Sequence, residues 1–106
     1  MTLKQTFLNA FNIKLPISGG SGNSIDTPII LDKDGPSNYV ETEQMILDYI
    51  GALRGITWKM VSQTVMKHKN RYIDQIKIKT VYNTKKEVKI QIESYYFDVD
   101  YFVRNS

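Results

Sequence analysis

Residues 56–103 are dominated by alternation between apolar and polar side chains, which is the period of a β-strand. The alternation is cleanest over residues 88–93, where aliphatic and polar residues take strict turns. Polar segments at residues 67–71 and 83–86 interrupt it and are typical of hairpin turns. This part of the chain is therefore predicted to form three consecutive antiparallel strands.

The alternation also predicts which side chains of these strands face the interior. The inward set is Ile56, Trp58, Met60, Thr64 and Met66 on the first strand, Tyr72, Ile76, Ile78, Thr80 and Tyr82 on the second, and Val88, Ile90 and Ile92 on the third. The parity changes at residues 95–97, after which Phe97, Val99, Tyr101 and Val103 are inward on a strand that continues to Val103. A one-residue slip reverses every side chain, so we expect a β-bulge near Tyr96.

A helix is predicted immediately before these strands. Asn38 can cap its amino terminus, and Glu41 adds negative charge near the positive end of the helix dipole. Its apolar side chains at helical spacing are Ile46, Tyr49, Ile50 and Leu53. Gly55 is placed to end the helix in the left-handed conformation.

The amino-terminal segment begins with a capping box formed by Thr2 and Gln5. Apolar residues at helical spacing predict a short helix from Leu3 to about Ala10. Pro16 makes a longer helix unfavourable, so an extended arm is expected to follow.

Residues 17–28 contain three of the six glycines. A phosphate-binding loop needs a lysine after its last glycine and a helix behind it, and this segment has neither. We interpret it as a mobile connector, with a ligand-gripping loop as the alternative. Pro28 then opens a short buried strand that ends at Leu31, and residues 32–36 are predicted to form a turn.

The resulting β-α-β-β-β order predicts an α+β fold, in which one main helix packs on a three- to four-stranded, mainly antiparallel sheet. We expect one domain over residues 1–106. It comprises an amino-terminal helix or arm (1–16), a glycine-rich loop (17–28) and the α+β core (29–103).

Composition excludes several kinds of chemistry. The chain has no cysteine, which excludes disulfides, thiolate nucleophiles and cysteine-based metal sites. No apolar run approaches the roughly 20 residues that span a bilayer, and the amino terminus lacks the features of a signal peptide. We therefore expect a cytoplasmic protein with no membrane association.

Three candidate catalytic or metal-binding groups have simpler interpretations. Asp32 and Asp34 resemble the start of a calcium loop, but the following glycine is misplaced and a turn fits better. His68, the one histidine, has no evident nucleophile to activate and is expected in a solvated turn. Asp98 and Asp100 would share one face of a strand, where a cation site or an acid–base pair competes with protection of the strand against aggregation. No catalytic, cofactor-binding or metal-binding residue is predicted.

Positive charge is the strongest functional signal. Residues 59–89 hold nine basic residues against two acidic ones, which leaves a net charge of +7 on this segment, although the whole chain carries +3. The predicted partner or polyanion face, on the sheet surface away from the helix, consists of Lys59, Lys67, Lys69, Arg71, Lys77, Lys79, Lys89 and the aromatic Tyr95. A merely solvated surface is the simpler interpretation, because lysine alternating with isoleucine is typical of an ordinary half-exposed sheet.

The sequence thus favours a small, non-enzymatic protein that binds another protein or a second copy of itself. Seven tyrosines agree with this hypothesis, because tyrosine is enriched at interfaces. Nucleic-acid or polyanion binding by the basic face is the second hypothesis. A hydrolase or metal-dependent enzyme that uses His68, Asp98 or Asp100 is the third.

Overall fold

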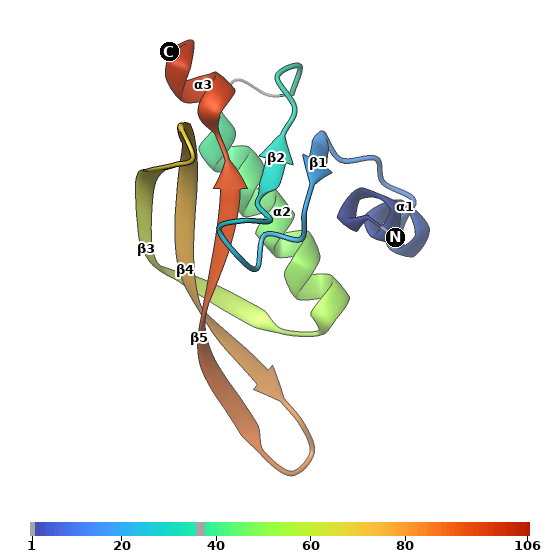
Figure 1. Cartoon of the computed structure of the whole chain (residues 1–106). Coiled ribbons are helices and arrows are strands. Elements are labelled where there is room, and N and C mark those ends of the chain that lie inside the picture. Colours follow the sequence, from blue (N-terminus) through green and yellow to red (C-terminus); the bar gives the residue numbers. More distant parts are fainter. Residues whose placement is uncertain (1, 36–37) are drawn as a thin grey trace.

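The computed structural model describes residues 2–35 and 38–106. Within these residues the chain forms three helices and a sheet of five strands, arranged as in Figure 1. In chain order the elements are α1 (Leu3–Phe11), β1 (Ile17–Gly19), β2 (Ile29–Leu31), α2 (Tyr39–Arg54), β3 (Thr57–His68), β4 (Arg71–Asn83), β5 (Val88–Asp98) and α3 (Asp100–Arg104).

The sheet has the strand order β1-β2-β5-β4-β3. β3, β4 and β5 form the predicted antiparallel meander. β2 runs parallel to β5, with Ile29 opposite Phe97, and β1 pairs antiparallel with β2. The α+β class is therefore confirmed, but the sheet of the described residues is mixed and has five strands instead of three or four.

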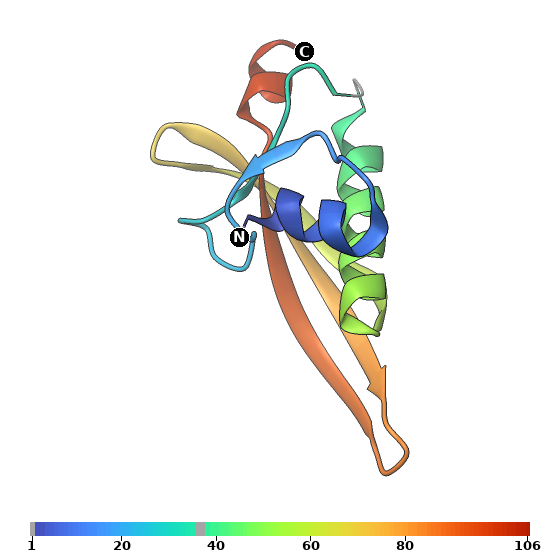
Figure 2. The ribbon, with the colours of Figure 1, turned by 90° about the vertical axis from the view of Figure 1, so that its right-hand side faces the viewer.

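α2 confirms the predicted helix, including both of its ends. The Asn38 side chain accepts hydrogen bonds from the N–H groups of the first turn, and Gly55 ends the helix at a φ of 70°. Ile46 and Ile50 are buried against the sheet, whereas Leu53 is exposed. Figure 2 shows α2 lying along one face of the sheet.

α1 confirms the predicted amino-terminal helix and its capping box. The Gln5 N–H donates to the Thr2 hydroxyl at 3.2 Å, and the Thr2 N–H donates to the Gln5 side chain at 3.1 Å. Phe7 is fully buried, and its ring centroid lies 6.0 Å from that of Tyr49 on α2. α1 is therefore packed into the same core as α2.

The glycine-rich segment is a hydrogen-bonded β-hairpin, which replaces the interpretation as a mobile connector. Its first residues form β1, and the loop closes with bonds from Gly20 N–H to the Pro28 carbonyl and from Gly22 N–H to the Thr27 carbonyl, both 2.9 Å long. The Gly22 carbonyl also accepts the N–H of Tyr96 at 2.7 Å. The hairpin thus holds one end of β5.

The parity of β5 differs from the prediction. β5 pairs with β4 residue for residue without interruption, so the bulge predicted near Tyr96 is wrong. Tyr95 and Phe97 are buried on the α2 side of the sheet. Val88, Ile90 and Ile92, predicted to be inward, are exposed on the opposite face.

The observed register shift lies in β3, between Met60 and Ser62. Trp58, before the shift, faces α2 as predicted and donates its indole N–H to Asp48 at 3.0 Å. Beyond the shift Gln63 faces α2, as its hydrogen bond to the Glu43 carboxyl of that helix shows. The inward positions predicted for Thr64 and Met66 are therefore wrong.

The predicted continuation of the last strand to Val103 is also wrong. β5 ends at Asp98 and α3 begins at Asp100. The Asp98 carboxylate accepts the N–H of Asp100 at 3.1 Å and so satisfies a donor of the first helical turn.

Candidate functional site

The predicted basic residues do not gather on one face. Lys59, Lys77 and Lys79 lie on the sheet face away from α2, Lys67 and Lys89 lie on the α2 side, and Lys69 and Arg71 lie at the β3–β4 turn. The bulge in β3 and the uninterrupted parity of β5 explain the difference, because each reverses the faces expected for its strand. Three of the seven cations thus remain on the predicted face.

Tyr95 is buried rather than outward, with 8% of its surface exposed. Its hydroxyl accepts a hydrogen bond of 2.8 Å from Arg54 at the end of α2. Arg54 also makes two bonds to Glu93, of 2.8 and 3.0 Å, and this contact lowers the pKa of the Glu93 carboxyl. Tyr95 therefore fixes α2 to β5 and is not available to stack on a base.

The β3–β4 turn is tied to the loop of the β1–β2 hairpin. The ring Nε2 of His68 lies 3.0 Å from Asp26, and the Lys69 ammonium lies 3.1 Å from the same carboxylate. Contact with His68 and then Lys69 lowers the pKa of Asp26. His68 thus contacts a carboxylate of the hairpin loop, whereas a solvated turn residue was expected.

Asp98 and Asp100 are buried and do not form an outward pair. Arg71 donates to Asp98 at 2.6 and 3.1 Å. Asp100 accepts the N–H of Tyr72 at 3.0 Å and the Arg104 guanidinium at 2.8 Å. Both carboxylates therefore join β4, β5 and α3.

The aspartates of the calcium-like segment lie in a turn closed by a 3.0 Å bond from Gly35 N–H to the Asp32 carbonyl. Pro36, the last residue of the predicted turn, lies outside the described residues. Among residues 2–35 and 38–106, no three or more histidine, aspartate or glutamate side chains are grouped so as to hold a metal ion.

Two acidic side chains are buried between α2 and the sheet. Glu43 and Asp74 are both 0% exposed, and burial, together with a hydrogen bond to the Asp74 carboxyl, raises the pKa of Glu43 to about 10. The Gln63 amide donates to Asp74 at 2.5 Å. Among the described residues, Glu43 Oε2 and Asp74 Oδ1 have no hydrogen-bond partner from another side chain, and a proton on Glu43 gives this buried pair a donor.

The ends of β4 and β5 project beyond the body as a two-stranded hairpin, which both views show (Figures 1 and 2). It lengthens the molecule to 48 Å, against 30 and 22 Å in the other directions. On the face away from α2 it carries Val88, Ile90 and Ile92, which are 61%, 58% and 61% exposed. We call these three residues the apolar stripe.

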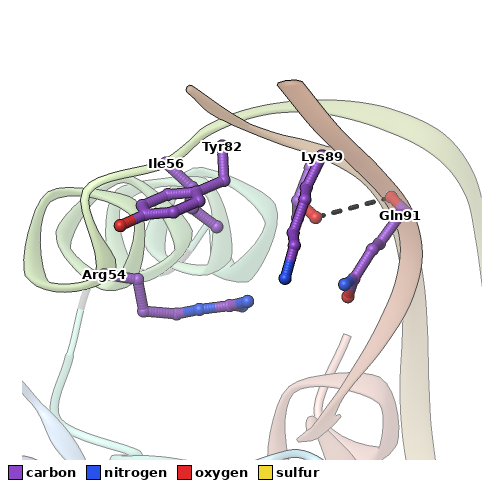
Figure 3. A pocket seen from close by; sticks show the side chains of 6 residues that line it. Arg54, Ile56, Tyr82, Lys89 and Gln91 are labelled. Atoms are coloured by element: carbon purple, nitrogen blue, oxygen red, sulfur yellow. Dashed lines mark hydrogen bonds between the residues drawn. The ribbon is translucent and has the colours of Figure 1, made fainter. Parts of the chain in front are cut away.

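A small pocket of about 230 Å³ lies at the base of this hairpin, on its other face. It is lined by Arg54, Ile56, Thr80, Tyr82, Lys89 and Gln91. Figure 3 shows the Arg54, Lys89 and Gln91 side chains pointing into one space beside the Tyr82 ring. These groups offer N–H donors, so the pocket suits an acceptor such as a carboxylate or a carbonyl oxygen.

The outer edge of β5 is open along the hairpin. β2 pairs with β5 at Phe97 and Asp98, and within the described residues no strand continues this pairing toward Val88. The Tyr96 N–H points away from β4 to reach Gly22. Backbone groups alternate between the two sides of an antiparallel strand. The N–H and C=O groups that point outward therefore belong to Val88, Ile90, Ile92 and Ser94.

We call these four residues the free edge. They are the candidate functional site, since they combine unpaired backbone groups with the exposed apolar stripe. The alternation in sequence predicted the apolar stripe to be core, so this site was not predicted. One signal was present: the parity of Phe97 and Val99, continued backward without a bulge, puts Tyr95 inside and the stripe outside.

Comparison of the chain with protein-family models, with curated protein sequences and with solved structures found no match. In the described part of the chain, no helix combines the length and the apolar character needed to cross a bilayer.

Proposed function

We propose that this chain is a non-enzymatic, cytoplasmic protein-binding module that pairs the free edge of β5 with an extended segment of another chain or of a second copy. In such β-strand addition, backbone hydrogen bonds supply affinity and alternate side chains supply specificity. The observation that carries the proposal is the coincidence of four outward-facing backbone positions with three exposed aliphatic side chains on one strand.

Proteins usually protect an edge of this kind. Common devices are proline, a bulge, inward-pointing charges or a covering loop. Residues 88–94 contain no proline, and β4 and β5 pair without a bulge along the hairpin. The charged residues of this stretch, Lys89 and Glu93, lie on the opposite face from the apolar stripe. An edge that lacks proline and a bulge, and whose charged side chains leave the apolar stripe uncovered, is suited to binding.

Polyanion binding is the second candidate, and one observation favours it. Lys59 lies directly opposite Lys79, with Lys77 nearby on the same face. Like charges opposite one another destabilise a sheet, so a bound anion would relieve a real repulsion. Reversal of all three lysines to glutamate is expected to abolish salt-sensitive retention on heparin. Unchanged retention would exclude this face as the anion site.

A proline at Ile90 tests the proposed edge binding. The Ile90 N–H points away from β4, so proline there removes a donor of the free edge but no bond of the β4–β5 ladder. The variant is expected to fold and to lose at least about tenfold in partner binding. Binding is measured by quantitative capture from native lysate and by sedimentation of the purified chain.

Val65→Pro is the matched control, because Val65 is a half-exposed aliphatic residue on β3, the strand at the other edge of the sheet. Its position opposite Asp74 makes its N–H point away from β4 by the same alternation. It is expected to bind as the wild type does. If Ile90→Pro remains folded and binds normally, the free edge is not the binding surface.

A further inference from the structure

We infer that the free edge of β5 pairs with the same edge of a second copy, antiparallel about a twofold axis at Gln91. The inference rests on the proposed function and names the partner. It is carried by the order of side chains along residues 88–94, which is self-complementary about its centre.

Antiparallel pairing about Gln91 places most residues of this stretch opposite a chemically matched partner. On the face away from α2, Ile90 meets Ile92 of the second copy, and Val88 meets Ser94. On the other face, Lys89 meets Glu93 of the second copy, and the two Gln91 side chains meet at the axis. Aliphatic pairs and opposite charges are the cross-strand neighbours that stabilise sheets.

This register also uses every backbone group of the free edge. Four residues from each copy contribute one N–H and one C=O each, so the pairing forms about eight hydrogen bonds. That number lies within the range of about ten, give or take five, found in stable protein interfaces.

Neighbouring registers fit less well. A shift of the axis to Ile92 places Val88 opposite Tyr96, whose N–H is already donated to Gly22. A shift to Ile90 places Lys89 opposite Gln91 and loses the charge pairs. A shift to Lys89 places the two lysines against each other, which is unfavourable. The register about Gln91 is therefore favoured by hydrogen bonding and by charge.

The charges provide a test by mixing two variants. Lys89→Glu alone gives two Glu–Glu contacts across the axis, and Glu93→Lys alone gives two Lys–Lys contacts. The dimer of each variant is expected to have a dissociation constant at least about tenfold higher than that of the wild-type dimer. An equimolar mixture is expected to recover the dimer, because every contact in the mixed pair joins opposite charges. Since Glu93 also binds Arg54, circular dichroism establishes that each variant is folded.

Cysteine crosslinking fixes the register, and the absence of native cysteine removes any background. Gln91→Cys places two non-hydrogen-bonded residues about 4.5 Å apart between Cα atoms, which a disulfide can bridge. Lys89→Cys, two residues away on the same face, is the control, because its two copies are separated by four residues, or roughly 13 Å. Under mild oxidation, Gln91→Cys is expected to crosslink at least tenfold faster than Lys89→Cys.

The inference is overturned if Gln91→Cys stays uncrosslinked or if Lys89→Cys crosslinks equally fast. It is also overturned if the wild type sediments as a monomer at every concentration up to about 100 μM. Such a result would mean that the dimer dissociation constant exceeds this value, which is too weak for an interface of this kind. Such a monomer that still captures another protein, in a manner abolished by Ile90→Pro, would exclude self-pairing and leave the proposed function intact.

Discussion

Glu43→Gln is expected to stabilise the protein at alkaline pH, by about 1–3 kcal/mol at pH 8. The glutamine amide can donate to Asp74 as the protonated carboxyl does, but it needs no proton from solvent. Urea unfolding followed by circular dichroism at several pH values measures the difference.

The sign follows from the direction of the pKa shift. Burial and the neighbouring Asp74 raise the pKa of Glu43 to about 10 in the folded protein, far above its ordinary value of 4.5. Between these two values the folded state holds a proton that the unfolded state has lost. The contribution of this group is therefore complete below about pH 4.5 and declines as pH rises toward 10, by at most about 1.4 kcal/mol per pH unit.

Glu41→Gln is the matched control, since Glu41 is an exposed glutamate on the same helix. It removes a carboxylate from the exposed side of α2, so it should not reproduce the flattened pH dependence of unfolding that is expected for Glu43→Gln. Wild-type and Glu43→Gln curves that run parallel from pH 5 to pH 9 would show that Glu43 does not hold a proton in the folded protein as described.

Phe7→Ala is expected to cost about 3–5 kcal/mol of unfolding free energy. The Phe7 ring is 0% exposed and packs between Phe11 of its own helix and Tyr49 of α2. Its removal leaves a cavity at the contact that holds α1 to the rest of the core. The loss is a large share of the stability of an ordinary domain of this size.

Leu8→Ala controls for helix propensity, because Leu8 follows Phe7 in α1 but is 43% exposed. It is expected to cost less than about 1 kcal/mol. If both substitutions have small effects in the same denaturation assay, α1 does not contribute to the cooperative core.

The helices α1 and α2 and the antiparallel meander were predictable from sequence, because their signals are local. Asn38 and Gly55 marked both ends of α2, and the turns at residues 69–70 and 84–87 marked the meander. β1 was not predictable, since three residues with a glycine give no periodic pattern. α3 was mistaken for strand because Phe102 and its neighbours continue the apolar content of β5.

The candidate site was missed for a physical reason. Beyond the base of the projecting hairpin, no helix and no second sheet of the described residues covers β5, so alternation no longer indicates which face is inside. Nearer the body, Glu93 faces α2 and is neutralised by Arg54, a pairing of residues 39 positions apart. The charge of Glu93 therefore predicted an exposed face, although Glu93 lies on the face that α2 covers.

Residue-resolved amide exchange tests the claim that the outer edge of β5 is the binding surface. In the free monomer, the N–H groups of Val88, Ile90, Ile92 and Ser94 should exchange rapidly, while those of Lys89, Gln91 and Glu93 are protected by β4. In the complex with a second copy or another chain, all seven should be protected. Formation of a complex that leaves the first four exchanging rapidly would contradict the claim.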